Sequence, residues 1–228
     1  MKDDSKPSLE NHTDDELPNS KLIASKQVWA KDKRLITGKV QSKKERLPPG
    51  QRLVNNWPVL DLGVQPDIEK SHWRLAIDGH VDAPMLLDWE AYLALPQVEI
   101  LSDIHCVTQW SLYDNLWQGV VTSQIIELVK PKPGTAHVLL YGFDGYTTNV
   151  TMESFAAADC LLAHQWNGQP IDREHGGPAR LIIPRYYLWK SAKWVKRIRF
   201  SDRDVPGFWE ERGYHNRGDP WLEERYSE

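Results

Sequence analysis

Three short segments of the 228-residue sequence carry side chains suited to hold a cofactor or a charged ligand. Cys106 offers a thiolate, which is a soft metal ligand and also a nucleophile. His175 is followed five residues later by Arg180, whose planar guanidinium can bind a phosphate through two parallel hydrogen bonds. Lys193 can add a point charge to the same anion. The pattern indicates a sulfur ligand or nucleophile beside an anion-binding group.

Each segment taken alone also has a plainer interpretation. A single cysteine at the end of an apolar strand is most often a small buried hydrophobic residue. His175 suits a loop histidine bonded to the backbone, and Arg180 suits a solvated or ion-paired strand residue. His105 does not form a catalytic pair with Cys106 merely by being its neighbour, because adjacent residues of a strand face opposite sides.

Two other classes of function therefore stay open at this point. A transferase or hydrolase could use Cys106 as its nucleophile, and it would need a histidine close in space. A cofactor-free binding module could line a groove with the eleven tryptophans of the chain. The second alternative explains the aromatic residues but leaves the ordered polar residues without a role.

Short strands and one hairpin are expected to position these residues. Alternating hydrophobic side chains from Val98 to Cys106 predict a strand with Cys106 at its end, on the face of its apolar neighbours. The Asp144-Gly145 pair supplies the positive φ that a hairpin turn needs. The remaining strands are expected over residues 73–78, 137–141, 146–151, 180–183 and 194–200.

Three short helices are predicted between these strands, each from a capping residue or from a proline that ends it. They cover residues 89–95 after Asp88, residues 122 or 123 to 130 before Pro131, and residues 154–164 with Ser154 as N-cap. The predicted fold class is α+β, with a mixed, strongly bent sheet and few short helices.

The composition excludes several classes of protein. A net charge of −4 gives no large basic surface for nucleic acid. Two cysteines, Cys106 and Cys160, are too few for a disulfide framework or a four-thiolate zinc site. No run of about 18 apolar residues predicts a membrane span. The polar N-terminus lacks the apolar stretch of a secretory signal, so we expect a cytoplasmic protein.

The chain divides into an arm and one domain. Residues 1–46 are expected to be disordered or extended, because the first part is polar and acidic and cannot bury enough surface to offset the entropy of ordering. The second part of the arm, from Lys21, is basic and solvated, with partner binding as an alternative. Residues 47–228 are expected to form a single domain, which we expect to be monomeric.

From about Gln51 to Tyr226 the sequence resembles the molybdopterin domain of the sulfite oxidase family, in particular its short, single-domain bacterial members. These are related to the catalytic subunit of periplasmic methionine-sulfoxide reductase. The likeness rests on ordered motifs that begin with Asn-Asn-Trp-Pro-Val at Asn55 and Ile-His-Cys-Val-Thr-Gln-Trp-Ser around Cys106. It implies a sulfite oxidase-type molybdopterin-binding fold, a molybdenum-molybdopterin cofactor and two-electron oxidoreductase activity.

The resemblance also implies roles for individual residues. Cys106 takes the place of the cysteine that ligates molybdenum, and Tyr214 that of an active-site tyrosine. The positions expected to bind the cofactor are Asn55, Pro58, Val59, Tyr141, His175, Arg180, Ser191, Ala192 and Lys193. For Tyr214, simple packing beside Trp209 and Trp221 is an equally open role.

The sequence departs from the sulfite oxidases where those enzymes place arginines around an anion pocket. Val54, Gln109 and Trp110 stand at these positions. A doubly charged sulfite would lose its charge-assisted hydrogen bonds there, so we expect oxygen-atom transfer on a small sulfoxide or N-oxide. The sequence shows no dinucleotide loop, haem attachment motif or iron-sulfur cysteine set, and we therefore expect an external electron-transfer protein as partner.

Overall fold

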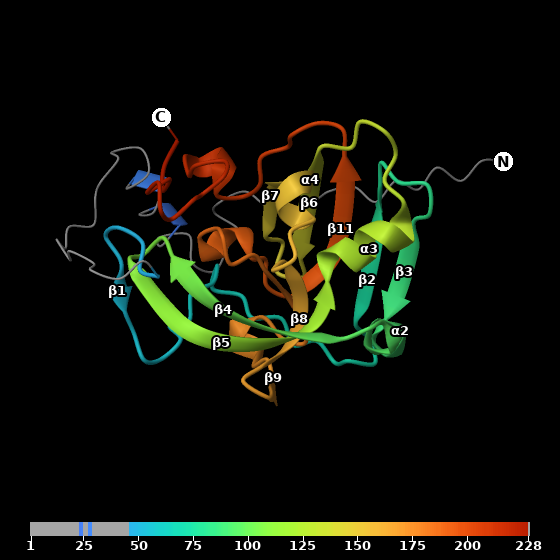
Figure 1. Cartoon of the computed structure of the whole chain (residues 1–228), viewed down its shortest axis with the longest axis horizontal. Coiled ribbons are helices and arrows are strands. Elements are labelled where there is room, and N and C mark those ends of the chain that lie inside the picture. The colour runs from blue at the N-terminus through green and yellow to red at the C-terminus, as the bar shows by residue number, and fades with distance from the viewer. Residues whose placement is uncertain (1–22, 25–26, 29–45, 228) are drawn as a thin grey trace.

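Two β-sheets frame the protein, and the computed structural model describes residues 23–24, 27–28 and 46–227 (Figure 1). The first sheet has six strands, in which β5 is the central member that pairs with β1, β4 and β8. Its strands are β1 (Arg52–Leu53), β4 (Val98–Cys106), β5 (Trp110–Val121), β8 (Leu161–Trp166), β9 (Gln169–Pro170) and β10 (Arg180–Ile182). The mixture of parallel and antiparallel pairs agrees with the predicted mixed sheet.

The second sheet has five strands in the order β3-β2-β11-β6-β7. They are β2 (Arg74–Gly79), β3 (Met85–Asp88), β6 (His137–Gly142), β7 (Thr147–Thr151) and β11 (Val195–Ser201). β6 and β7 form the predicted hairpin around Asp144-Gly145, and Gly145 has the expected positive φ of 84°. β2 and β11 run parallel, so segments from the two ends of the domain lie side by side in this sheet.

Short helices connect the strands, as predicted. The α-helices are α2 (Trp89–Ala94), α3 (Thr122–Val129) and α4 (Met152–Phe155), and the 3₁₀ helices are η2 (Arg173–His175), η3 (Leu188–Lys190) and η4 (Glu210–Arg212). Asp88 caps α2, with its Oδ1 atom accepting a hydrogen bond from the amide of Ala91 at 2.8 Å. α3 ends at Lys130, which is left-handed, directly before Pro131.

The prediction of a helix over residues 154–164 is wrong. Only one turn, α4, forms there, and its N-cap is Thr151, whose side chain accepts from the amide of Ser154. The residues beyond it form β8, which lies between β5 and β10. Leu161, Leu162 and Ala163 are completely buried. A strand buried on both faces has a continuous apolar pattern like that of a buried helix, and sheet pairing here outweighs helix propensity.

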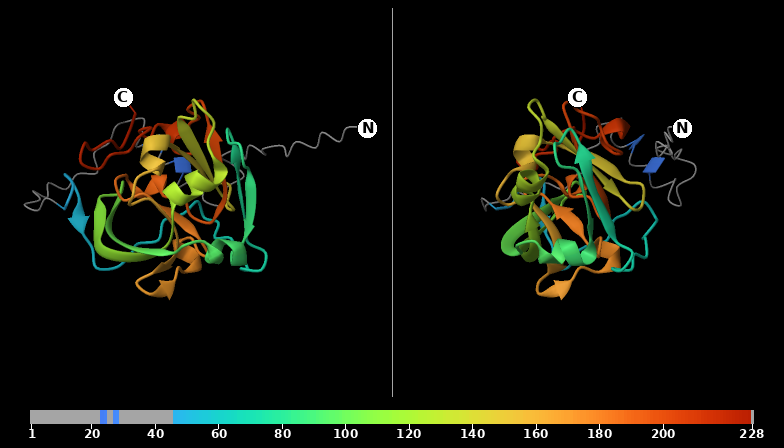
Figure 2. Two further views of the ribbon diagram at one scale, coloured as in Figure 1. Left: turned by 45° about the vertical axis from the view of Figure 1, so that its right-hand side comes forward. Right: turned by 90° about the vertical axis from the view of Figure 1, so that its right-hand side faces the viewer.

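The β4–β5 hairpin is long and strongly curved (Figures 1 and 2). Its register shifts between Ser102 and Ile104, opposite Asp114, which has a positive φ of 57°. The side chain of Asp103 accepts a hydrogen bond from the amide of Asp114 at 3.0 Å and fixes this irregularity. A bulge of this kind bends a sheet, and Cys106 lies at the end of β4 beyond this bend.

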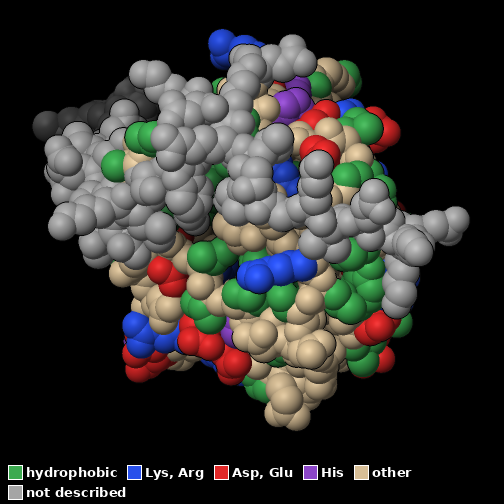
Figure 3. Space-filling view, turned by 90° about the vertical axis from the view of Figure 1, so that its left-hand side faces the viewer, with side chains coloured by type: hydrophobic (Ala, Val, Ile, Leu, Met, Phe, Trp, Pro, Cys, Tyr) green, Lys and Arg blue, Asp and Glu red, His purple; other side chains and the backbone are tan. Residues whose placement is uncertain are grey.

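The core between the elements is rich in aromatic side chains, as the tryptophan content indicated. Trp73, Trp117 and Trp194 are at most 1% exposed. Ile23, one of the few described residues of the N-terminal arm, is completely buried and belongs to the same core. The expectations for residues 1–22, 25–26 and 29–45 lie outside the described residues. Figure 3 shows a face on which hydrophobic side chains surround a basic side chain near the centre, with a cluster of acidic and basic side chains at the lower left.

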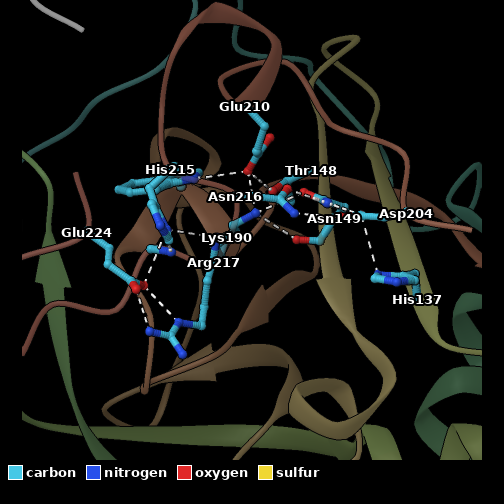
Figure 4. A network of polar contacts seen from close by, with 12 residues as sticks. His137, Thr148, Asn149, Lys190, Asp204, Glu210, His215, Asn216, Arg217 and Glu224 are labelled. Carbon is cyan, nitrogen blue, oxygen red and sulfur yellow. Dashed lines mark hydrogen bonds and ion pairs between the residues drawn. The ribbon is translucent and has the colours of Figure 1, made fainter. Parts of the chain in front are cut away.

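A buried polar network anchors the C-terminal segment to the domain (Figure 4). The carboxylate of Glu210 accepts hydrogen bonds from Thr148 at 2.9 Å and from the indole of Trp189 at 3.0 Å, and it pairs with Lys190. Lys190 also donates to the carbonyl and the side-chain oxygen of Asn149, both at 2.9 Å. The network joins β7, η3 and η4, and it fixes the segment that continues to Tyr214.

None of the helices in the described part of the chain is long and apolar enough to cross a membrane.

Candidate active site

One pocket collects most of the residues singled out in the sequence. It encloses about 820 Å³, including the part open to solvent. Its walls come from the end of β4, the β6–β7 turn, the loops after β1 and around η2 and η3, and the C-terminal segment. The lining residues are Trp57, Pro58, Leu60, Asp61, Leu62, Cys106, Val107, Thr108, Trp110, Asp144, Tyr146, His175, Arg180, Leu188, Trp189, Ser191, Lys193, Trp194, Trp209 and Tyr214.

Cys106 enters the pocket from the last position of β4. Its side chain is 6% exposed, and its Sγ atom lies 3.1 Å from the hydroxyl of Thr108. Its carbonyl oxygen accepts hydrogen bonds from the side chain of Gln51 and from the amide of Gln109, each at 3.1 Å. Gln109 has a positive φ of 68°, which closes a tight turn to β5. This turn holds Cys106 and Thr108 at the pocket wall.

His105 lies on the opposite face of β4, outside the pocket lining. Its ring packs edge-on against Trp221 at 4.9 Å, and its Nδ1 atom lies 2.8 Å from the hydroxyl of Ser111. Burial lowers the pKa of His105 to about 4, so the imidazole is neutral near pH 7. The alternation expected from the strand is confirmed, and His105 is not placed to act as a base on Cys106.

Arg180 is a buried cation in the pocket wall. Its side chain donates to the carbonyl of His175 at 2.7 Å and to the carbonyl of Ser191 at 3.0 Å. The guanidinium lies 5.0 Å from the ring centroid of Trp57. Burial lowers the pKa of Arg180 to about 9, which is still above neutral pH. Arg180 thus connects two loops of the pocket, in addition to any ligand that it binds.

His175 stacks on Trp57, with ring centroids 4.2 Å apart and an interplanar angle of 20°. Its Nε2 atom lies 3.2 Å from the carbonyl of Trp57. Within the described residues, its buried Nδ1 atom has no hydrogen-bond partner, and the carboxylates of Asp172 and Glu174 are 3.9 Å away. Burial lowers the pKa of His175, which favours a neutral ring.

The two glycines after His175 lie where the chain packs closely against itself. A Cβ atom on Gly177 would lie 2.1 Å from the carbonyl of Ile171, and one on Gly176 would lie 2.8 Å from the Cβ of Lys193. Both glycines therefore let the chain pack closely against itself, which fixes His175 and Lys193.

Lys193 lies on the same side of the pocket as Arg180. Its ammonium donates to the carbonyl of Glu174 at 2.7 Å and lies 4.6 Å from the ring centroid of Trp194. Burial, reinforced by the charge of Arg180, lowers the pKa of Lys193 to about 8. The ammonium is therefore mostly charged at neutral pH, and an anion beside it would favour that form.

Tyr214 is delivered to the pocket by the C-terminal segment and is 4% exposed. Its ring contacts the rings of Trp189 at 5.2 Å, Trp209 at 5.0 Å and Tyr226 at 5.5 Å. Burial raises the pKa of Tyr214, and the neighbouring Tyr226 and Cys106 raise it further. The phenol is thus both packed among aromatic rings and present at the pocket, with its proton retained.

The pocket brings together seven of the eleven residues selected from the sequence: Pro58, Cys106, His175, Arg180, Ser191, Lys193 and Tyr214. The other four lie outside the lining. Asn55 is exposed, and Val59 is 36% exposed. Tyr141 lies in β6 under the guanidinium of Arg197, at 5.5 Å. Ala192 is buried between its two lining neighbours, and its carbonyl accepts a hydrogen bond from the amide of Leu181.

The sequence reasoning missed Asp144 as a pocket residue. Its carboxylate accepts a hydrogen bond from the amide of Tyr146 at 3.1 Å, and burial raises its pKa to about 6. In the sequence, Asp144 was assigned only to the turn of the hairpin. Trp57 and Asp61 were also missed, because each enters the pocket from a loop whose path no local pattern reveals.

Comparisons with known proteins agree with this geometry. A family model described as an oxidoreductase molybdopterin binding domain matches residues 62–209. The uncharacterized oxidoreductase YuiH of Bacillus subtilis strain 168 is 45% identical over 183 residues, which cover 80% of this chain and 92% of YuiH. The protein-methionine-sulfoxide reductase catalytic subunit MsrP of Burkholderia mallei is 29% identical over 153 residues. The match covers 60% of this chain but 46% of MsrP, so the chain spans less than half of that relative.

A solved structure supports the fold. The sulfane dehydrogenase SoxCD from Paracoccus pantotrophus superposes with a TM-score of 0.57 at 24% identity, covering 62% of this chain and 41% of that chain. At this identity the likeness concerns the arrangement of the strands and helices alone.

Proposed function

The chain belongs to the family of oxidoreductase molybdopterin-binding domains, and from this premise we propose that Cys106 is its metal ligand and that a sulfoxide or N-oxide is its substrate. The protein is a molybdopterin-dependent oxidoreductase with the sulfite oxidase-type fold. Its cofactor is molybdenum-molybdopterin. The specific reaction, the substrate and the roles of the individual residues are the proposed part.

The residues of the pocket fit this cofactor. A cysteine sulfur at the wall is the soft donor that molybdenum needs beside the two sulfurs of the pterin dithiolene. Arg180 is a buried cation and Lys193 a half-buried cation in the same pocket, and both keep N–H groups beyond those bonded to backbone carbonyls. The buried Nδ1 of His175 has no partner among the described residues. This set of donors suits an organic ligand that ends in a phosphate.

The proposed roles follow from these positions. Cys106 would bind the metal, and Arg180 and Lys193 would bind the phosphate, with Lys193 acting as a point charge. Pro58, His175 and Ser191 line the pocket between them and would contact the pterin. Asn55, Val59, Tyr141 and Ala192 do not line the pocket, and the proposal does not depend on them.

When bound, molybdenum supplies two-electron oxygen-atom transfer. The chain contributes orientation, exclusion of water and a proton donor. Trp110, Trp189 and Trp209 form an aromatic wall that keeps bulk water from the reacting atoms. The phenol of Tyr214 keeps its proton because burial raises its pKa, and it can donate a hydrogen bond or a proton to the oxygen that is transferred.

The charge of the pocket supports a neutral substrate, and this is the observation that carries the proposal. Its lining holds two cations, Arg180 and Lys193, which the cofactor would engage together with the neutral ring of His175, and the carboxyl groups of Asp61 and Asp144 lie in the same lining. Of the three positions where sulfite oxidases carry arginines, Trp110 lines the pocket, and Val54 and Gln109 lie outside the lining. A dianion would therefore find no arginine beyond Arg180 within the described lining, whereas a neutral sulfoxide loses little there.

The reduction of a sulfoxide or N-oxide consumes two electrons and two protons and releases water. The proposal therefore includes an external electron-transfer protein as the source of electrons. The thiol-enzyme alternative is less well supported, because the chain matches the molybdopterin-binding family and His105, the histidine adjacent to the thiol, faces away from the pocket; His175 is the histidine that shares the pocket lining with Cys106.

The experiment uses protein made in a host that produces molybdopterin. We expect about one molybdenum per chain, and rapid reoxidation of the reduced protein by methyl sulfoxides or N-oxides. The oxidised protein should be reduced slowly or not at all by sulfite. Rapid reduction by sulfite would overturn the substrate proposal while leaving the cofactor in place. Metal-free protein that alkylates quickly at Cys106 would instead support the thiol enzyme.

A further inference from the structure

The carbonyl groups of Cys106 and Val107 are each held by a buried side chain from outside the pocket. Gln51, which is completely buried, donates to the carbonyl of Cys106 at 3.1 Å. Arg225, which is 4% exposed, donates through Nη1 to the carbonyl of Val107 at 2.5 Å. Neither Gln51 nor Arg225 lines the pocket. Both side chains therefore bind the turn that carries Cys106 from the side away from the pocket.

Arg225 brings a positive charge to this place. An arginine side chain stays protonated in proteins. Its guanidinium lies 4.9 Å from the ring centroid of Tyr187, and within the described residues its Nε and Nη2 atoms have no hydrogen-bond partner. Its ion pair with Glu223 is long, at 3.9 Å, and the Glu223 side chain is 45% exposed. The charge is therefore buried and only weakly balanced.

We propose that Arg225 is a positioning residue that fixes Cys106 through the Val107 carbonyl and raises the reduction potential of the metal bound to its sulfur. This inference rests on the proposed function, in which Cys106 is the ligand. Reduction adds electrons to the metal centre, and a nearby positive charge stabilises the more negative, reduced state. Hydrogen bonds and charges near the ligand of a metal change the reduction potential of that metal.

The position of Arg225 in the chain makes the inference specific. The family match ends at residue 209, whereas Arg225 lies in the segment that follows it. That segment is tied to the domain by the buried Glu210 network and by a bridge between Tyr214 and Tyr226. The same segment thus supplies the phenol of Tyr214 on the pocket side of Cys106 and the cation of Arg225 on the side away from the pocket.

The test compares two variants that each retain a hydrogen-bond donor at this position. Arg225→Lys keeps the positive charge, and Arg225→Gln removes it. Molybdenum content is measured first, and then the midpoint potential of the metal is measured by a spectroscopic redox titration. We expect Arg225→Lys to remain near the wild-type potential. Arg225→Gln should shift the ratio of oxidised to reduced centre at least tenfold toward the oxidised form, about 30 mV downward for a two-electron couple.

A third variant, Glu223→Gln, should shift the midpoint potential upward, so the proposal can still be tested if Arg225→Gln does not fold. Glu223→Gln removes the partly balancing carboxylate from an exposed side chain, so it should fold normally and raise the potential slightly. Arg217→Gln, an arginine of the same segment that pairs with Glu224, serves as the control and should leave the potential unchanged.

The outcomes separate this inference from the proposed function. If the wild-type protein binds no molybdenum, the proposed function fails. If wild type and variants bind it equally and the potentials of Arg225→Gln and Glu223→Gln equal that of wild type, the role of Arg225 is overturned. Equal downward shifts in Arg225→Lys and Arg225→Gln would show that charge is not the cause, which also overturns it.

Discussion

The ammonium of Lys190 lies 2.5 Å from the Oε1 atom of Glu210, and the two side chains are only 1% and 2% exposed. A buried ion pair holds well only when further hydrogen bonds satisfy both partners. Here Lys190 donates twice to Asn149, and the Oε1 atom of Glu210 accepts from Thr148 and Trp189, whereas its Oε2 atom has no partner among the described residues. Because Trp189 lines the pocket and contacts Tyr214, the pair stabilises one wall of the active site as well as the fold.

Breaking this pair should strongly destabilise the protein. Glu210→Gln leaves the Lys190 charge buried without its carboxylate, and we expect the free energy of unfolding to fall by about 3–5 kcal/mol. Urea unfolding of the purified protein measures this loss. Glu211→Gln, at the exposed neighbouring position, should stay within about 0.5 kcal/mol of wild type. The idea fails if both variants unfold at the same urea concentration.

Cys106 and Cys160 provide a matched pair for the metal ligand. Cys106→Ser replaces the sulfur at the pocket wall, so the molybdenum content should be lost or the spectrum of the metal should change. Cys160 is completely buried, lies outside the pocket lining and has a pKa raised by burial to about 12, which keeps it a thiol. Cys160→Ser should therefore keep one molybdenum per folded chain. Elemental analysis decides, and equal metal with an unchanged spectrum in Cys106→Ser would refute the assignment.

Arg180 is expected to control cofactor retention in two ways. Arg180→Ala removes a phosphate donor and also the hydrogen bonds to the carbonyls of His175 and Ser191. We therefore expect reduced cofactor occupancy, measured as molybdenum per chain after gel filtration, together with lower thermal stability. Arg185→Ala, which breaks a partly exposed pair with Asp159, is the control. Full loading of Arg180→Ala would remove Arg180 from the phosphate site.

Cofactor retention should weaken as the pH rises through the pKa of Lys193. That pKa is lowered to about 8 in the cofactor-free pocket, so a growing share of the free sites loses the ammonium between pH 7 and 9, while a phosphate monoester is mostly ionised there. The fraction of molybdenum retained after dialysis should fall over this interval in wild type and stay level in Lys193→Arg. Lys196→Arg is the control and should lose molybdenum over this interval as wild type does. Molybdenum retention that does not change with pH in wild type would contradict the role of Lys193 in binding the phosphate.

The stability of the cofactor-free protein should respond to the same group with the opposite sign. An unfolded lysine keeps its proton up to about pH 10.4, whereas folded Lys193 loses it near 8. The unfolded state binds more protons between these values, so the contribution of Lys193 to stability rises with pH in this window. Opposite trends of retention and stability would separate a loss of binding from unfolding.

Local patterns predicted those elements whose residues interact mainly with their neighbours. Asp88 capped α2 as expected, and the Asp144-Gly145 pair formed the predicted turn. The long strand β5 was not predicted, because Asp114 and Asn115 interrupt its apolar pattern like a turn. In the structure Asp114 accommodates the bulge opposite Asp103, an arrangement that depends on the partner strand. Pairing between distant segments also produced β8 in place of the predicted helix.

The sequence motifs predicted the region of the candidate site, but they did not show which residues of each motif line the pocket. Ser191 and Lys193 line the pocket, while the alternation of the chain directs Ala192 away from it. Tyr141 was selected in β6, but Asp144, in the turn that follows, reaches the pocket instead. The role of Arg225 had no local signal at all, since it depends on where the C-terminal segment lies.

The parallel pairing of β2 with β11 sets an order of events during synthesis of the protein. Residues 74–79 find their partner only when residues 195–201 have been made, and the pocket gains Tyr214 later still. Contacts so distant in sequence form late. A nascent chain that stops short of its last segment lacks Trp209 and Tyr214, so the pocket that Cys106 lines is complete only after that segment has been made.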